Sequence, residues 1–476
     1  MEVDDFQSST EAFLSWQSAI GVWMSPKMAL KDLRSESRGR GVVAIADFEQ
    51  DEVVFSIPRS AVLNIATALP DIGTESSQSA IRAMPSWLAL TALMLSESLR
   101  KDSKWAPYFA VLPRELDSLV FWSEPEIKEL QASAVVTKIG KGTAEEMFTQ
   151  HIAPLGLDNY SIEMCHRVAS VIMAYAFDIP EEKTTGTMDD NEGSEGGDDL
   201  VSDDEEEEKT VLSMVPLADM LNADADRNNA RLCCDNEELE MRTIKPIAAG
   251  EEIFNDYGPL PRSDLLRRYG YITDQYAVYD VVEISTESML SAFRTGGRVS
   301  PNLQLNSEDL EKRVELTQRE DVYDQSYDIR HAGPEGPSIP DELLAFLYIL
   351  LLDEENLAAI SSSQSYLPSR SKMATETLGQ VLVTLLRLRE EEYATTLEED
   401  EALLKSENLP NRTRMAIEVR LGEKKVIREA IQEASSFSGS NKRMRGGQNP
   451  EGQIPGEKGK RRSEESSHPK KKRRFG

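Results

Sequence analysis

Cysteine and histidine are scarce in this 476-residue chain, which holds three cysteines and four histidines. Two of the cysteines, Cys233 and Cys234, are adjacent. So few thiols exclude a disulfide framework and a zinc site built on several Cys-x-Cys pairs, and they are typical of a reducing compartment. The four histidines do not cluster with other metal-binding side chains in the sequence. We therefore predict no metal centre.

Basic residues are also in the minority, with 53 Lys and Arg against 84 Asp and Glu and a formal net charge of −31. Such a balance argues against specific nucleic-acid binding and favours attraction to basic partners. Ribosomal proteins and histones are basic proteins of this kind. The alternative is that the acidity serves only solubility.

Long apolar runs are missing as well. The most apolar segment is Leu343–Leu352, which is too short to cross a bilayer, so we expect no membrane association. The first residues, Met1-Glu2-Val3-Asp4-Asp5, are acidic, and we expect no secretory leader. The length predicts two to four domains with a substantial core.

The most informative stretch is Val215–Gly258. It opens with Val215-Pro216-Leu217-Ala218-Asp219-Met220-Leu221-Asn222 and closes with Gly250-Glu251-Glu252-Ile253-Phe254-Asn255-Asp256-Tyr257-Gly258. Short apolar runs bounded by Asn, Asp and Gly predict strands at Ala230–Cys234 and Leu239–Thr243. Gly250 predicts a turn into a further strand at Ile253-Phe254.

Two asparagines and two tyrosines stand in a fixed order here: Asn222, then Asn255 and Tyr257, and then Tyr269. This order resembles the C-terminal half of a SET domain, the fold of protein-lysine methyltransferases. The resemblance is closest to the group of the Rubisco large-subunit methyltransferase and SET-domain-containing protein six, with its fungal ribosomal-protein lysine methyltransferases. It implies S-adenosyl-L-methionine as cofactor.

The resemblance also implies an α+β fold class. We expect a β-rich SET domain with a helical insert, followed by an all-helical C-terminal substrate-binding domain. Many histone-directed SET enzymes close the lysine channel with a zinc cluster, which three cysteines cannot supply. The C-terminal domain is therefore expected to help cover the channel.

A Gly-punctuated turn, Arg38-Gly39-Arg40-Gly41, precedes predicted strands at Val42–Ala44 and Val53–Pro58. Glycine lets a backbone approach a ligand closely. Alone, the pattern predicts an ordinary hairpin turn. SET domains begin in a similar way, however, and the resemblance implies that Arg38, Gly39, Arg40 and Gly41 contact the methionine part of the cofactor.

The segment from residue 85 to about 180 is mainly helical by its pattern and resembles the insert of the same group. We expect helices at Trp87–Leu95, from Glu124 onward, and at Val168–Phe177. The resemblance implies substrate contacts at Trp122 and Ala176 and a cofactor contact at Tyr175. The alternative is that both aromatic residues belong to the core.

The remaining segments complete the domain plan. Residues 1–24 contain an N-terminal helix, 25–271 the SET domain, 280–436 a helical domain and 437–476 a disordered basic tail. Helices are expected at Pro340–Leu352, Leu378–Leu388 and Arg412–Ile431. Dense acidic charge and few apolar residues predict a disordered loop at about 181–210.

The tail carries two basic clusters, Lys442–Arg445 and a longer one between Lys458 and Arg474. Such clusters bind nuclear import receptors or nucleic acid. On an acidic protein we favour import, and so predict a nuclear location and an import receptor as partner. Binding of the acidic loop within the same chain is a further possibility.

A lysine methyltransferase must bind a neutral amine, although free lysine has a pKa of about 10.4. Burial in an apolar channel beside a sulfonium cation favours the neutral form. The resemblance places the Tyr257 hydroxyl where it orients the amine, as the catalytic residue, and Tyr269 in the same channel. It places Asn222, Ala223 and Asn255, together with both tyrosines, at the cofactor. The family often has His where this chain has Ala223, whose backbone can keep the adenine contact.

Three functions are compatible with these residues. The first is a protein-lysine N-methyltransferase that adds a single methyl group to a large-subunit ribosomal protein. The second keeps this chemistry with a histone or transcription factor as substrate. The third is a non-enzymatic binding scaffold, which the two asparagines and two tyrosines of the motifs argue against.

Overall fold

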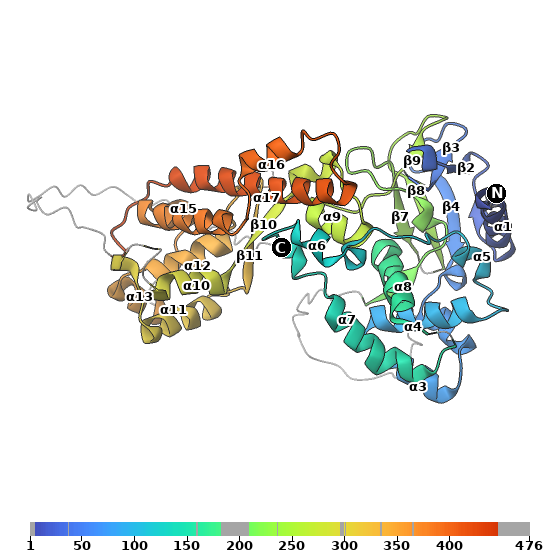
Figure 1. Cartoon of the computed structure of the whole chain (residues 1–476), viewed down its shortest axis with the longest axis horizontal. Coiled ribbons are helices and arrows are strands. Elements are labelled where there is room, and N and C mark those ends of the chain that lie inside the picture. Colours follow the sequence, from blue (N-terminus) through green and yellow to red (C-terminus); the bar gives the residue numbers. More distant parts are fainter. Residues whose placement is uncertain are drawn as a thin grey trace, which may run out of the picture.

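A computed structural model of the chain describes residues 5–36, 38–158, 160–181, 209–235, 237–295, 299, 301–333, 336–363 and 366–445. The chain forms two lobes arranged along the long axis of the molecule (Figure 1). One hydrophobic core is built from residues between Phe13 and Ile253, and another from residues between Val282 and Met444. We call the two parts the N-terminal and the C-terminal lobe.

The N-terminal lobe contains small antiparallel sheets with the orders β1-β4-β8-β7, β2-β3-β9 and β5-β6. Their strands are β1 Trp23–Met24, β2 Met28–Asp32, β3 Arg40–Ala44, β4 Val53–Pro58, β5 Ala176–Pro180, β6 Thr210–Met214, β7 Ala230–Cys234, β8 Glu238–Thr243 and β9 Glu252–Ile253. The strands predicted at 53–58 and 230–234 have the expected bounds. The strand predicted at 239–243 begins one residue earlier.

Helices surround these sheets. They are α1 Phe6–Ala19, α2 Ile65–Ala68, α3 Glu75–Arg82, α4 Ser86–Leu99, α5 Ala106–Phe109, α6 Glu124–Lys128, α7 Lys141–Met147, α8 Ile162–Tyr175 and α9 Arg262–Tyr269. Helix α4 contains the predicted helix at 87–95, and every position from Leu88 to Glu97 is buried, so its apolar residues face core on all sides.

The helix predicted at Val168–Phe177 was wrong at its end. Helix α8 stops at Tyr175, and Ala176 starts strand β5, where it lies opposite Met214 of β6. Pairing with a strand more than 30 residues further along the chain outweighs the local helical preference of this apolar run. As a result, Tyr175 lies at a helix–strand junction.

The C-terminal lobe is mainly helical. Its helices are α10 Thr286–Thr295, α11 Ser307–Arg319, α12 Asp341–Leu351, α13 Glu354–Ser361, α14 Arg370–Met373, α15 Glu376–Glu391, α16 Leu397–Leu403 and α17 Asn411–Ser435. The all-helical prediction was wrong in one respect, because β10 Val281–Ser285 pairs with β11 Ser326–Arg330. Alternate residues of both strands are buried, a period-2 pattern that is hard to see in five-residue segments.

Part of the predicted disordered tail is folded. Residues 437–445 pack on the C-terminal lobe, where Met444 is 3% exposed and the Arg445 amide donates to the carbonyl of Leu351. The backbone of the first basic cluster is therefore held at the C-terminal end of α12, whose residues from Leu343 to Leu351 are buried in the core. No helix in the described part of the chain is long and apolar enough to cross a membrane. The predicted acidic loop, from 182 to 208, and the tail beyond 445 lie outside the described residues.

A smaller apolar cluster joins the lobes. It combines residues of the insert, of α9 and of α17: Leu119, Trp122, Leu130, Val135, Leu266, Met415, Ala416 and Val419. Buried charges lie nearby, where Asp400 of α16 binds Arg420 and Lys424 of α17. Buried ion pairs gain little net stability but are costly to break. Arg420 also donates to the backbone carbonyl of Glu129 in the insert, so this buried charge cluster extends from the C-terminal lobe to the joint.

We expect Gly422→Ala to destabilise this joint. A Cβ on Gly422 would lie 1.9 Å from Oδ2 of Asp280, whose carboxylate binds Arg262 with both partners buried. Overpacking of a buried site costs about 1–3 kcal/mol, so the midpoint of urea unfolding should fall clearly. Gly142→Ala, in an open position of α7, is the control and should be neutral or slightly stabilising. An unchanged midpoint in Gly422→Ala would contradict the packing described.

Candidate active site

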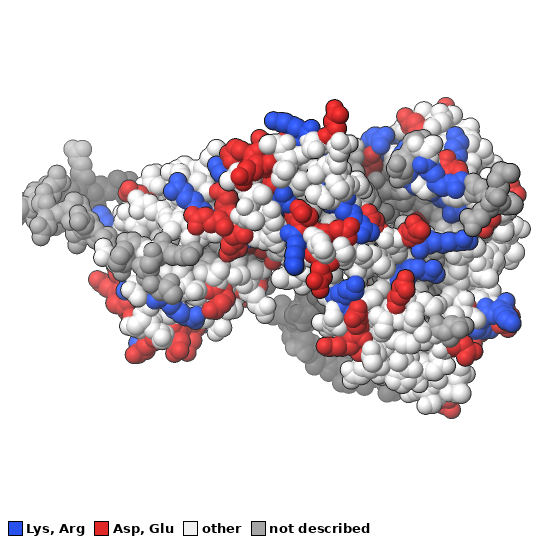
Figure 2. Space-filling model, in the orientation of Figure 1, with Lys and Arg blue, Asp and Glu red and all other residues white. Residues whose placement is uncertain are grey.

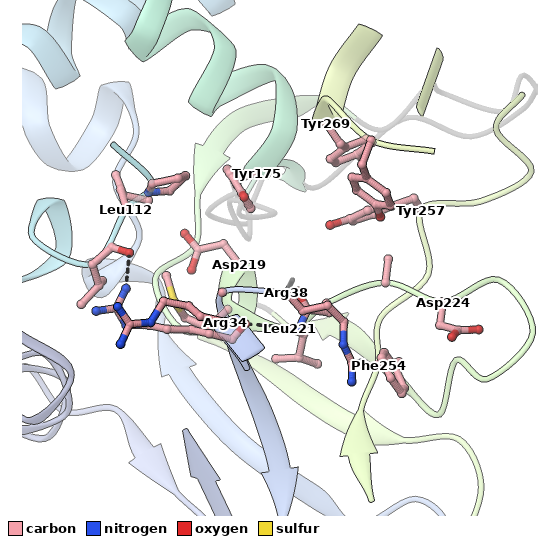
Figure 3. A pocket seen from close by; sticks show the side chains of 18 of the residues that line it. Arg34, Arg38, Leu112, Tyr175, Asp219, Leu221, Asp224, Phe254, Tyr257 and Tyr269 are labelled. Atoms are coloured by element: carbon pink, nitrogen blue, oxygen red, sulfur yellow. Dashed lines mark hydrogen bonds between the residues drawn. The ribbon is translucent and has the colours of Figure 1, made fainter. Parts of the chain in front are cut away.

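A cavity of about 1040 Å³ lies in the N-terminal lobe between the start of β3, the N-terminus of α1 and the C-terminal ends of α8 and α9 (Figure 3). Many residues singled out by the sequence line it: Arg38, Gly39, Arg40, Tyr175, Asn222, Ala223, Tyr257 and Tyr269. Gly41, Trp122, Ala176 and Asn255 are not among its lining residues. The structure therefore brings together segments that lie far apart in the sequence.

The two asparagine segments run side by side under the cavity. The Asn255 amide donates to the carbonyl of Asn222 at 2.9 Å, and the Asp224 amide donates to the carbonyl of Asn255 at 3.2 Å. Asn229 binds the segment before Asn255. Its side chain accepts a hydrogen bond from the Phe254 amide and donates one to the carbonyl of Glu252. The backbone of Asn255 thus aligns the two segments, and its predicted cofactor contact stays a prediction.

Asn222 is held by the turn before β3. Its side-chain nitrogen donates to the carbonyl of Arg40 at 3.2 Å and to the carboxylate of Glu252 at 2.6 Å. This leaves the amide oxygen as the group that can accept a hydrogen bond from a ligand. A Cβ on Gly41 would lie 3.1 Å from this nitrogen and 2.7 Å from the Glu252 carboxylate, so Gly41 is needed for the approach.

Arg40 has structural partners in α1 and near α5 that the sequence did not suggest. Its guanidinium donates to the hydroxyls of Ser9 and Thr10 and to the carbonyls of Phe6 and Val111, and it lies 3.9 Å from the centroid of the Phe6 ring. The side chain therefore fastens α1 to the turn before β3. As a consequence, Asp5, Phe6 and Ser9 of the N-terminal segment form one wall of the cavity.

Tyrosines make the opposite wall. The rings of Tyr257 and Tyr269 stack with a centroid distance of 4.1 Å and an angle of 9°, and Tyr271 meets Tyr269 edge-on at 6.3 Å. Tyr175 faces the same space from the end of α8 (Figure 3). Such an apolar wall suits the aliphatic part of a lysine side chain.

Burial raises the pKa of Tyr257 well above its ordinary value, and the neighbouring tyrosines Tyr271, Tyr269 and Tyr175 raise it further. Burial also raises the pKa of Tyr269 to about 12. Both hydroxyls are therefore protonated at neutral pH. They can donate or accept hydrogen bonds, but neither is an effective general base.

Asp219 is a cavity residue that the sequence analysis did not single out. Its carboxyl accepts hydrogen bonds from the Tyr108 hydroxyl and from the Leu217 amide, and it faces the cavity beside Tyr175 (Figure 3). Burial raises the pKa of Asp219 to about 7, against the opposing effect of these hydrogen bonds. An acid inside the apolar run Val215–Leu221 was a signal that could have found it.

Asp219 should make ligand binding depend on pH. Below pH 7 its carboxyl is mostly protonated, and above pH 7 it is an anion that attracts a cationic ligand, so S-adenosylmethionine affinity should rise between pH 6 and 8. We expect Asp219→Asn to remove this rise and to weaken binding at pH 8 about tenfold. Calorimetric titration with S-adenosylmethionine at about pH 6 and about pH 8 measures the affinity of both proteins. The same rise in the variant would contradict the assignment.

Two predicted substrate residues lie elsewhere. Trp122 is 4% exposed within the cluster that joins the lobes, and its ring nitrogen donates to the carbonyl of Asp117. Ala176 is partly buried as the first residue of β5. Their predicted substrate contacts stay predictions.

The sequence analysis also missed Phe254. This residue lines the cavity, and the guanidinium groups of Arg38 and Arg227 lie over its ring.

The cavity fits the predicted cofactor. Its volume is in the range of small-molecule sites, and it offers a carboxyl, a free amide oxygen and aromatic surfaces for a cationic nucleoside. The residues that would hold S-adenosylmethionine are those of the turn before β3 and of the Asn222–Ala223 segment. When bound, this cofactor supplies the sulfonium methyl group. The described residues contain no group of His, Cys, Asp and Glu side chains that could hold a metal ion.

Comparisons with known proteins identify the domains to which these lobes correspond. The chain matches the SET domain family over residues 39–258 and the Rubisco LSMT substrate-binding family over residues 304–427. It is 32% identical over 368 residues to Ribosomal lysine N-methyltransferase 4 of Saccharomyces cerevisiae, covering 71% of each chain. It is 25% identical to N-lysine methyltransferase SETD6 of Homo sapiens, covering 88% of this chain and 94% of that one.

Among solved structures, the SET domain of LSMT bound to lysine and AdoHcy superposes with a TM-score of 0.66 at 19% identity, covering 90% of this chain and 91% of that chain. Fold and site together define an S-adenosyl-L-methionine-dependent protein-lysine methyltransferase. The chain belongs to the SET-domain family, in the group that carries a C-terminal Rubisco LSMT substrate-binding domain.

Proposed function

We propose that this enzyme transfers a single methyl group to a lysine of a large-subunit ribosomal protein, and that the transfer takes place at Tyr257. The stack of Tyr257 on Tyr269 carries the placement, because it puts a neutral hydroxyl beside an aromatic wall that can hold a lysine chain. The similarity to Ribosomal lysine N-methyltransferase 4 supports the substrate class.

The residues of the site would act by positioning. The tyrosine wall excludes water and disfavours the charged amine, and the Tyr257 hydroxyl orients the amine lone pair toward the methyl group. Asn222 and the turn before β3 would hold the cofactor at its methionine end, and the Ala223 backbone would hold its adenine. No covalent intermediate would be required: the neutral amine would take the methyl group directly and become a methylammonium ion, with S-adenosylhomocysteine as the other product.

Surface charge supports a basic substrate. Asp and Glu side chains are dense over the C-terminal lobe on the face shown in Figure 2. Among the exposed acidic residues of this lobe are Glu398, Glu399 and Glu401 of α16. Complementary charge speeds the encounter with a basic partner and favours it over acidic ones.

The test is transfer of labelled methyl groups to fractionated ribosomal proteins and, in parallel, to core histones. We expect one basic large-subunit ribosomal protein to become labelled, with monomethyl-lysine as the product in mass spectrometry. Label on histones alone would show the second candidate substrate class. Label on neither, from an enzyme that binds the cofactor, would overturn the ribosomal proposal.

We also propose a nuclear location directed by the basic cluster between Lys458 and Arg474. The backbone of the other cluster, Lys442–Arg445, is fixed at the C-terminal end of α12, and we therefore favour the longer cluster as the import signal. A fluorescent fusion that ends at residue 445 should lose nuclear accumulation. The same distribution as the full chain would contradict this proposal.

A further inference from the structure

The first turn of α17, in the C-terminal lobe, reaches into the N-terminal lobe through Arg412. Its guanidinium binds the carboxylate of Asp117 at 2.6 Å and that of Glu126 at 2.9 Å. It also lies 5.7 Å from the centroid of the Trp122 ring. Planar arginine can satisfy two carboxylates and an aromatic face together, which lysine cannot. This one side chain therefore connects α17 to three residues of the insert.

Both the side chain and the backbone carbonyl of Asp117 are held by hydrogen bonds. Arg412 holds the carboxylate, and the ring nitrogen of Trp122 donates to the backbone carbonyl at 2.9 Å. Trp122 is itself buried in the cluster that joins the lobes. The position of the Asp117 backbone thus depends on Arg412 and Trp122 together.

The Asp117 backbone packs directly against Gly270. A Cβ on Gly270 would lie 2.5 Å from the carbonyl carbon of Asp117 and 2.6 Å from the Ser118 nitrogen. Gly270 separates Tyr269 from Tyr271, which both line the cavity. Because the two backbones pack without room for a Cβ, a shift of Asp117 toward Gly270 would displace the tyrosines on either side of this glycine.

A second set of contacts ties the same helix end to α17. Leu266 of α9 is fully buried in one cluster with Met415 and Val419 of α17. The amide of Gly270 donates to the carbonyl of Leu266 at 3.0 Å. The end of α9 is therefore enclosed between α17 on one side and Asp117 on the other.

We infer that Arg412 is a positioning residue for methyl transfer, which sets the Tyr269–Tyr257 stack through Asp117 and Gly270. The inference rests on the proposed placement of the reaction at Tyr257. It gives the substrate-binding lobe a direct mechanical connection to the reacting centre. It also gives Trp122 a structural role, because the ring nitrogen of Trp122 holds the backbone carbonyl of Asp117.

The test compares Arg412→Ala with Arg428→Ala. Arg428 is the matched control, since it lies on the same helix and pairs with Glu390 inside the C-terminal lobe. Steady-state methyl transfer gives kcat and KM, and calorimetry gives the cofactor Kd. Incorporated 3-fluorotyrosine, with signals assigned by Tyr269→Phe and Tyr271→Phe, reports the environment of the two rings by fluorine NMR.

We expect Arg412→Ala to lower kcat about tenfold or more, since small misplacements of reacting groups are costly. The cofactor Kd should stay within about twofold of the wild-type value because, among the described residues, Arg412 and the cofactor site share no direct contact. The signals of Tyr269 and Tyr271 should shift, Arg412→Lys should restore part of kcat, and Arg428→Ala should match the wild type.

A wild-type kcat in Arg412→Ala would overturn the inference, and so would a change confined to KM with unmoved fluorine signals. If Arg412→Ala fails to fold, Asp117→Asn decides in the same way, because it removes the charge that Arg412 binds and keeps the side-chain size. Failure of the proposed reaction centre is distinguishable, since it would appear as full activity in Tyr257→Phe whatever Arg412 does.

Discussion

Tyr257→Phe should lower kcat by about a hundredfold or more, which is the usual cost of removing one hydrogen-bonding group aimed at a reacting centre. The variant loses only the hydroxyl. The ring can still stack on Tyr269 at 4.1 Å, so the shape of the wall is preserved. The cofactor Kd should therefore change little, and the loss should appear in kcat.

The control for this variant is Tyr366→Phe, which makes the same chemical change at a tyrosine that is 83% exposed in the C-terminal lobe. Its activity should equal that of the wild type. Labelled methyl transfer at saturating cofactor, with calorimetry for the Kd, makes the comparison. If Tyr257→Phe kept most of its activity, the hydroxyl would have no part in orienting the amine.

Gly270→Ala is also expected to lower kcat, but for a different reason. Gly270 has a φ of +77°, and an added Cβ would overlap the backbone of Asp117 and Ser118. A side chain in this left-handed conformation costs about 1–2 kcal/mol, and the overlap adds to this. The structure can relieve it only by moving Asp117 or the tyrosines on either side.

The variant Gly250→Ala separates the effect of the positive φ from that of the overlap with the backbone of Asp117 and Ser118. Gly250 also has a positive φ, of +95°, but nothing lies within 4 Å of the added Cβ. We expect both variants to lower the midpoint of thermal unfolding, and only Gly270→Ala to lower kcat, by at least about tenfold. Equal activities in the two would show that the packing against Asp117 does not control the site.

Much of the site could be predicted from the sequence because its motifs are local. The segments around Asn222 and Tyr257 carry their turns, strands and polar residues within a few positions of one another. The same holds for β4 and β7, whose apolar runs end at Pro, Asn or Asp. Short-range patterns of this kind determine where strands begin and end.

The features that the sequence did not reveal depend on contacts between distant segments. Strand β5 forms because it pairs with β6, and α1 joins the cavity because Arg40 binds Ser9 and the carbonyl of Phe6. The resemblance assigned Trp122 to the substrate, although an aromatic residue in an insert can serve a ligand or a core equally well. The structure places Trp122 beside Arg412 and Asp117, and its substrate contact stays a prediction.

The most direct test of this account is a crystal structure of the enzyme with S-adenosylhomocysteine and lysine. We predict the nucleoside against Ala223 and Phe254, the sulfur facing the Tyr257 hydroxyl, and the lysine amine between Tyr257 and Tyr175. A ligand bound elsewhere, or one whose sulfur points toward Phe6 and away from the tyrosines, would contradict the placement of methyl transfer proposed for this cavity.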